Sequence, residues 1–125
     1  MSRNTEKEKK LISNGAEFDR LLKEKDVIFV LFSNDGCGYC KLAEKNINKV
    51  IDSFPQLELY QLKLTDAPEI FERYGINSVP VSKVFKEGEA VYTGFGVRSS
   101  NDIYYQLKAY FGSSNTYFQE LADNS

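Results

Sequence analysis

Residues 27–40 read VIFVLFSNDGCGYC, and this stretch decides the fold. Its first part, 27–32, is a continuous apolar and partly β-branched run, which is typical of a parallel strand buried on both faces. Residues 33–36 have the composition of a turn. The apolar residues that follow recur at spacings of three and four, which predicts a helix over 37–54 that Pro55 ends. The stretch therefore predicts a buried strand, a turn and a long helix, with two cysteines where the helix begins.

The flanking sequence supplies the remaining elements of an α/β domain. In chain order these are a weak edge strand over 9–13, a helix that Asn14 caps, a strand over 57–64, a short helix that Gly75 follows, a hairpin of strands 81–86 and 89–93 joined by Glu87-Gly88, and a last helix opened by Ser99. Strand, helix and strand in succession imply a parallel pair with a right-handed crossover, and the hairpin adds antiparallel strands. The predicted fold is α/β, a central mixed sheet with helices on both faces.

Length and composition exclude several classes of protein. The 125 residues are enough for one domain, and the net charge of −2 argues against a nucleic-acid binder. Histidine is absent, which excludes Ser/His/Asp and Cys/His nucleophile pairs and every His-ligated metal site. Two cysteines cannot form a four-thiolate zinc site within one chain. No apolar run approaches the roughly 18 residues that a membrane span needs.

The two ends of the chain are more polar than its middle. We expect a charged flexible leader over 1–8, one domain over 9–112 and a polar C-terminal tail over 113–125. The leader is not followed by the apolar stretch of a secretory signal, so we expect a cytoplasmic protein without membrane contact. We also expect the protein to be a monomer.

Cys37-Gly38-Tyr39-Cys40 is the candidate for chemistry. At a helix N-terminus, unpaired N–H groups and the helix dipole favour an anion, so we expect the pKa of Cys37 to fall below the usual ~8.5. A thiolate is the attacking species in disulfide exchange. Cys40 lies three residues further on, on the face that packs against the sheet, close enough to attack a mixed disulfide formed by Cys37. The spacing thus predicts an exposed attacking cysteine and a shielded resolving cysteine.

Two other interpretations of the cysteine pair stay open. Two chains could pool four thiolates around zinc or an iron–sulfur cluster. The pair could also be inert, although a structural disulfide closing so small a loop would constrain the unfolded chain little.

From about residue 9 to residue 111, the sequence resembles thioredoxin. The resemblance rests on the motif CGYCK (37–41), on PEIFERYGINSVP (68–80) and on VFKEGEAVYTGFG (84–96). It implies a thioredoxin-like three-layer α/β/α sandwich and a redox-active disulfide that takes part in cell redox homeostasis. It also implies that no cofactor is held by the chain itself.

The resemblance assigns further residues to substrate binding. Pro80 corresponds to the family's cis-proline beside the cysteines, and the main chain of Val79 would pair with an extended substrate peptide. Gly96 corresponds to a glycine that lets substrate approach, and Gly36 and Tyr39 flank Cys37 and Cys40. From the residues alone, Pro80 could equally open a strand and Gly96 could be an ordinary turn glycine.

The sequence also departs from the family. A thioredoxin usually has Trp before the first cysteine, where this chain has Gly36. Many have a buried Asp six residues before the first cysteine and a Lys paired with it, where this chain has Leu31 and Gln61. Without these groups we predict slower resolution by Cys40 than in an ordinary thioredoxin. Asp35 should oppose thiolate formation slightly, through its like charge.

Three functions are compatible with these observations. The first is a thiol–disulfide oxidoreductase that acts on protein disulfides through Cys37 and Cys40 and is reset by thioredoxin reductase or another external reductant. The second is a glutathione-linked, glutaredoxin-like enzyme, supported mainly by Tyr39. The third is a binding module of the same fold that recognises a partner through the groove beside Pro80 without catalysis.

Overall fold

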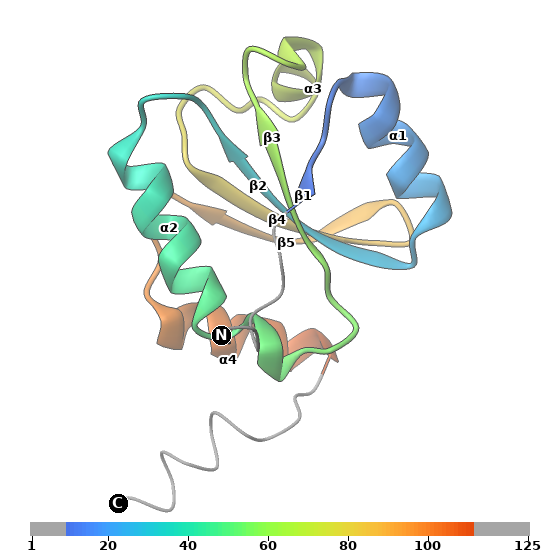
Figure 1. Cartoon of the computed structure of the whole chain (residues 1–125). Coiled ribbons are helices and arrows are strands. Elements are labelled where there is room, and N and C mark those ends of the chain that lie inside the picture. Colours follow the sequence, from blue (N-terminus) through green and yellow to red (C-terminus); the bar gives the residue numbers. More distant parts are fainter. Residues whose placement is uncertain (1–9, 112–125) are drawn as a thin grey trace, which may run out of the picture.

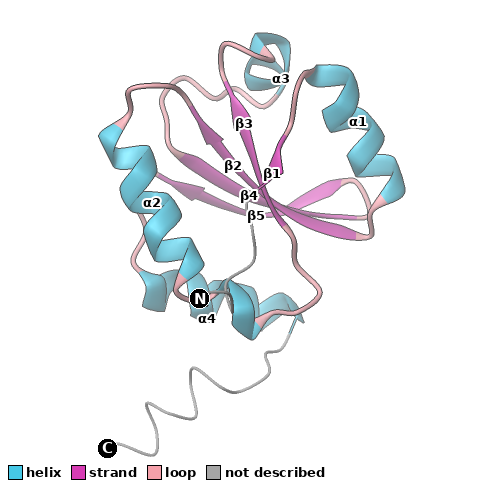
Figure 2. Cartoon of the chain, viewed as in Figure 1, coloured by secondary structure: helices cyan, strands magenta, loops and turns pink. Residues whose placement is uncertain are grey.

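The computed structural model describes residues 10–111, so the expected leader and tail lie outside the described residues. Within this range a mixed sheet has the strand order β1-β3-β2-β4-β5 (Figures 1 and 2). The strands are β1 (Lys10–Leu11), β2 (Val27–Ser33), β3 (Leu59–Lys63), β4 (Val81–Lys86) and β5 (Glu89–Phe95). The first three run parallel to one another, and β4 and β5 are antiparallel to their neighbours. The predicted α/β class with a central mixed sheet is confirmed.

Helices cover both faces of the sheet (Figure 2), and each face has its own hydrophobic core. Helices α1 (Gly15–Glu24) and α3 (Pro68–Arg73) lie on one face, and α2 (Gly38–Asn48) and α4 (Ser100–Phe111) on the other. Alternate residues of β2 point to opposite faces: Val30 and Phe32 join the α1/α3 core, and Phe29 and Leu31 join the α2/α4 core. This two-sided burial explains the continuous apolar run of β2. None of the helices within residues 10–111 is both long and apolar enough to cross a bilayer.

The helix predicted over 37–54 is shorter than the pattern indicated. The α-helix ends at Asn48, and a separate 3-10 turn, η1 (Ile51–Ser53), follows it. Val50 leaves the helical region at φ −120°, and its N–H donates to the carbonyl of Ile47 three residues back. Val50, Ile51 and Phe54 are nevertheless fully buried, so the core face continues from α2 into the 3-10 turn.

Candidate redox site

Cys37 and Cys40 are joined as a disulfide at the start of α2, with their Cα atoms 5.3 Å apart. Cys37 is the N-cap residue, and the backbone N–H of Cys40 donates to the Cys37 sulfur over 3.1 Å. Cys37 is half-buried, whereas Cys40 is only 4% exposed and lies on the inner side of the helix. Cys37 is therefore the more accessible of the two, although it is half-buried where the sequence predicted an exposed residue, and the helix directs an N–H group at its sulfur.

Three segments that are distant in sequence meet at the carboxyl end of β2. The pairing of Phe32 with Val81 places Pro80 beside the end of β2, from which the chain runs directly to Cys37. The N–H of Gly96 donates to the carbonyl of Pro80 over 2.9 Å, which brings the end of β5 to the same edge. The Val79–Pro80 peptide bond is cis, the form that the resemblance implies. The sheet topology thus gathers Cys37, Pro80 and Gly96.

The other residues assigned to substrate binding differ in exposure. Gly36 precedes the first cysteine with a φ of +75°, a conformation that favours glycine. The side chain of Tyr39 is 72% exposed between the cysteines. Val79 is half-buried against the α1/α3 core, and its main chain lies before the segment of β4 that pairs with β2. Phe95, which the sequence analysis did not single out, is 71% exposed next to Gly96. Two large apolar side chains thus lie on segments of this site.

A cavity of about 200 Å³ opens beside Cys40 on the α2 side of the sheet. Its walls come from the loop before the disulfide, from α2 and from β3: Asn34, Asp35, Gly36, Cys37, Cys40, Lys41, Glu44, Gln61 and Lys63. The register pairs Leu31 with Gln61, so the two residues that replace the family's Asp and Lys are neighbours. Leu31 is fully buried in the α2/α4 core, and the amide of Gln61 donates to the hydroxyl of Ser33. Because Leu31 is apolar, the polar groups beside Cys40 are those of the residues that line this cavity.

Asp35 has a partner that the sequence did not predict. The ammonium of Lys63, at the end of β3, lies 3.0 Å from a carboxylate oxygen of Asp35. The lysine side chain is 28% exposed and the aspartate side chain 74% exposed, so solvent weakens this ion pair. A cation beside Asp35 offsets the repulsion that this carboxylate would exert on a Cys37 thiolate. Lys63 was missed because a strand lysine alone does not indicate which loop it reaches.

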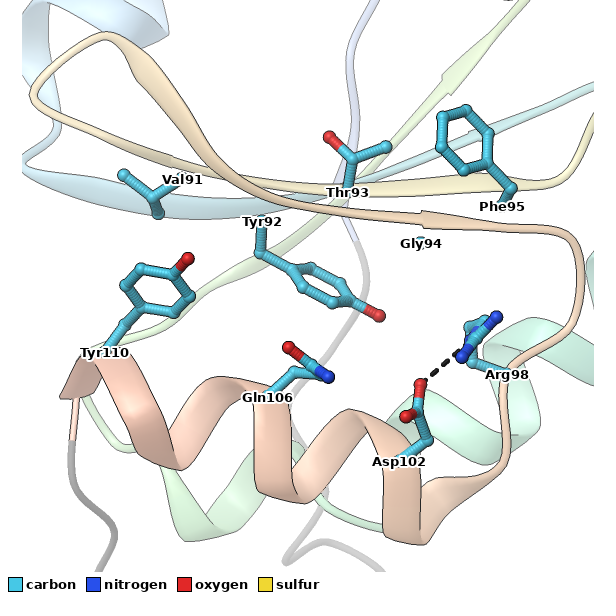
Figure 3. Close-up of a pocket in the computed structure, with 9 residues that line it drawn as sticks. All are labelled: Val91, Tyr92, Thr93, Gly94, Phe95, Arg98, Asp102, Gln106 and Tyr110. Carbon is cyan, nitrogen blue, oxygen red and sulfur yellow. Dashed lines mark hydrogen bonds and ion pairs between the residues drawn. The ribbon is translucent and has the colours of Figure 1, made fainter.

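A second cavity, of about 300 Å³, lies between β5 and α4 and contains neither cysteine (Figure 3). Arg98 and Asp102 form an ion pair of 2.8 Å at one end of this cavity. The Tyr92 hydroxyl is buried and lies so close to Gly94 that a β-carbon at this position would clash with it. In residues 10–111 no cluster of three Cys, Asp or Glu side chains is arranged to hold a metal ion. The cysteine pair and the cavity beside Cys40 are therefore the centre of the site.

Comparison with known proteins gives a consistent family. Residues 9–109 match the family model described as Thioredoxin. The chain is 26% identical over 91 residues to Thioredoxin 1 of Plasmodium falciparum, covering 73% of this chain and 88% of that protein. It is 32% identical over 85 residues to the thioredoxin-like protein YusE of Bacillus subtilis, covering 68% of this chain and 80% of that protein. The fold matches oxidised mitochondrial Thioredoxin 3 of Saccharomyces cerevisiae with a TM-score of 0.71 at 21% identity, covering 80% of this chain and 93% of that chain.

Proposed function

The chain belongs to the thioredoxin family, and from that premise we propose that its substrates are disulfide bonds of other proteins. Members of the family are thiol–disulfide oxidoreductases, and with its Cys37–Cys40 pair this chain is one as well. The observation that carries the proposal is the asymmetry of the pair, since the half-buried Cys37 at a helix N-terminus lies beside Cys40, which is only 4% exposed.

Disulfide exchange then proceeds in two steps. In the reduced protein, the Cys37 thiolate attacks a substrate disulfide, forms a mixed disulfide and releases the first substrate sulfur as a thiolate, which takes up a proton. The thiolate of Cys40 next attacks the Cys37 sulfur, the bond from Cys37 to the substrate breaks, and its electron pair leaves on the second substrate sulfur. The substrate gains two electrons and two protons, and the Cys37–Cys40 disulfide forms.

The groove beside the cysteines supports a peptide substrate. The main chain of Val79 precedes the paired segment of β4, where an extended peptide could add its own hydrogen bonds. Exposed aromatic side chains such as Tyr39 and Phe95 are typical of protein recognition surfaces. In this proposal Gly36, Tyr39, Val79, Pro80 and Gly96 contact the substrate.

An external reductant must return the disulfide to the dithiol. We propose a thioredoxin reductase as that partner. We also propose that the protein acts in the cytoplasm as a monomer. Glutathione is the second candidate, favoured by Tyr39 between the cysteines. Turnover with NADPH plus reductase, compared with turnover on glutathione, distinguishes the two.

Reduction of insulin in the presence of dithiothreitol tests the proposed function. Wild type should accelerate insulin precipitation, Cys37→Ser should show only the background rate, and Cys40→Ser should accumulate mixed disulfides with substrate. Equal rates for wild type and Cys37→Ser would contradict the proposed enzymatic function and would favour a binding module without catalysis.

A further inference from the structure

Resolution of the mixed disulfide requires the Cys40 thiol to lose a proton. We propose that Glu44 on α2 accepts this proton through water in the cavity beside Cys40. The inference rests on the proposed function, because it concerns the second step of that exchange reaction.

Helix α2 places the two groups on one side of the cavity. Glu44 follows Cys40 by four residues, and side chains with this spacing are neighbours on a helix surface, with Cβ atoms about 5–6 Å apart. Both residues line the cavity of about 200 Å³; Cys40 is 4% exposed and Glu44 is half-buried. In β2, the buried position six residues before Cys37 is the apolar Leu31. At this position the strand therefore provides no carboxylate for Cys40.

The cavity wall can hold the water that the transfer requires. The buried side-chain oxygen of Asn34 has no hydrogen-bond partner among the described protein atoms. Gln61 adds a second polar group to the wall, fixed by its hydrogen bond to Ser33. Ordered water in proteins needs a polar site with two to four partners and room for at least one molecule, and this cavity meets both conditions.

Charged groups of both signs line the cavity. The charged groups that line it with Glu44 are Lys41 on the same helix, Lys63 on β3 and Asp35 on the loop, and Lys63 is paired with Asp35. Two cations and one other anion therefore line the same cavity as Glu44. A carboxylate that lines a hydrated cavity can act as a proton acceptor for a thiol in the same cavity.

The step conserves protons and electrons. A water molecule takes the proton from the Cys40 sulfur and gives one of its own protons to the Glu44 carboxylate. The Cys40 electron pair forms the bond to the Cys37 sulfur, the bond from Cys37 to the substrate breaks, and the substrate sulfur leaves with that bond's electron pair. The proton then returns from Glu44 to the leaving sulfur through solvent, so Glu44 ends the step ionised.

Stopped-flow reaction of the reduced protein with an aromatic disulfide, dithiobis(nitrobenzoate), tests the proposal. The first release of coloured thiolate reports attack by Cys37, and the second reports resolution by Cys40. At neutral pH, Glu44→Gln should leave the first phase unchanged and slow the second by about tenfold or more, since a positioned proton acceptor contributes ~10²–10⁴-fold when it acts directly. At alkaline pH the two proteins should converge, because hydroxide then ionises the Cys40 thiol in both.

Matched variants separate this role from a structural or purely electrostatic one. Glu72→Gln removes an exposed carboxylate from α3 and should change neither phase. Glu44→Asp keeps a carboxylate and should retain part of the second phase at neutral pH. An unchanged or faster second phase in Glu44→Gln would overturn the proposal, because loss of a negative charge by itself favours a thiolate. Failure of wild type to release either thiolate would instead count against the proposed function.

Discussion

Leu31 lies fully buried in the middle of β2, directly beside Gln61 of β3. Its side chain packs in the α2/α4 core with Ala43 and Ile47, which come from the helix that carries both cysteines. Many thioredoxins have an aspartate at this point of the sequence. Here the surroundings are apolar, so the position contributes packing to the base of α2 instead of a proton acceptor.

Leu31→Asp should therefore lower the free energy of unfolding at neutral pH by more than about 3 kcal/mol, because a charge is buried without a partner. Burial raises the pKa of such a carboxyl above the ~3.9 of an unfolded chain, so the loss should shrink as the pH falls toward that value. Urea unfolding over a range of pH measures it. Leu31→Asn is the control and should be destabilised without that pH dependence.

Adding Gln61→Lys to Leu31→Asp places a cation beside the new carboxylate and should recover part of the lost stability at neutral pH. Equal stability of the single and the double variant would show that the two side chains do not interact.

At the scale of single residues, the sequence was most informative where local secondary structure alone sets the surroundings of a side chain. The roles of Cys37 and Cys40 followed from their places in the first helical turn, whereas Pro80 and Gly96 came from the resemblance. Lys63 could not be assigned, because its contact with Asp35 depends on how far β3 extends beside β2.

The hairpin of β4 and β5 shows how a local signal fixes an element. Glu87-Gly88 was predicted to be a tight turn, and both residues have positive φ, 52° and 84°. Lys86 and Glu89 are the paired residues next to the turn, so the turn itself has two residues. A glutamate in the left-handed region is strained, and asparagine adopts that conformation more readily.

Glu87→Asn should increase the free energy of unfolding by about 0.5–1 kcal/mol, because it reduces the backbone strain of this turn. Guanidinium unfolding at neutral pH measures the change. Glu89→Asn is the matched control: it removes the same charge at the first residue of β5 and should give no gain, since asparagine is depleted in strands. A similar gain in both variants would attribute the effect to charge instead of backbone conformation.

Helix ends were harder to predict than strands. The apolar spacing continues without interruption past Asn48, because Val50, Ile51 and Phe54 are all core residues. Periodicity identifies which residues face the core, and it does not distinguish an α-helix from an α-helix followed by a 3-10 turn. The burial of these residues was therefore predictable, and the break between the two helical segments was not.

Over the whole molecule, the site depends on pairings that no local pattern specifies. The order of elements predicted parallel strands followed by a hairpin, but the neighbours of β2 on each side follow only from the complete sheet. Those neighbours decide that β4 brings Pro80, and β3 brings Gln61 and Lys63, to the end of β2. The cavity beside Cys40 is a product of this arrangement, which is why the sequence did not indicate it.

The amino end of the domain is joined to the sheet by a group of polar contacts around Glu58. Its carboxylate accepts a hydrogen bond of 2.9 Å from the Tyr60 hydroxyl and lies 3.3 Å from the ammonium groups of both Lys10 and Lys25. The hydrogen bond from Tyr60 and the two lysines lower the pKa of Glu58. Burial, together with the bond to Glu58, raises the pKa of Tyr60 to about 12. The short edge strand β1, the start of β2 and β3 all meet at this group.

These shifts predict how stability depends on pH. In the unfolded chain tyrosine ionises near pH 10, and in the fold Tyr60 ionises near pH 12. Its contribution is therefore complete below about pH 10 and is lost as the pH rises toward 12. Glu58 has the opposite sign: its contribution is complete above the pH at which an unfolded glutamate titrates, and it is lost as the pH falls through the lowered folded value.

Tyr60→Phe removes the hydroxyl with the raised pKa, which is also the hydrogen-bond donor to Glu58, so it should flatten both limbs of the stability curve. Urea unfolding at intervals from acid to alkaline pH gives the free energy for each protein. The difference between wild type and Tyr60→Phe should be largest near neutral pH and shrink toward either extreme. Tyr92→Phe is the control: burial, and then the nearby charge of Asp102, raise the pKa of Tyr92, but within residues 10–111 its hydroxyl donates no hydrogen bond to a carboxylate, so this variant should alter the alkaline limb only. A constant difference between wild type and Tyr60→Phe at every pH would mean that the ring's packing, and not the Tyr60–Glu58 hydrogen bond, holds this end of the domain together.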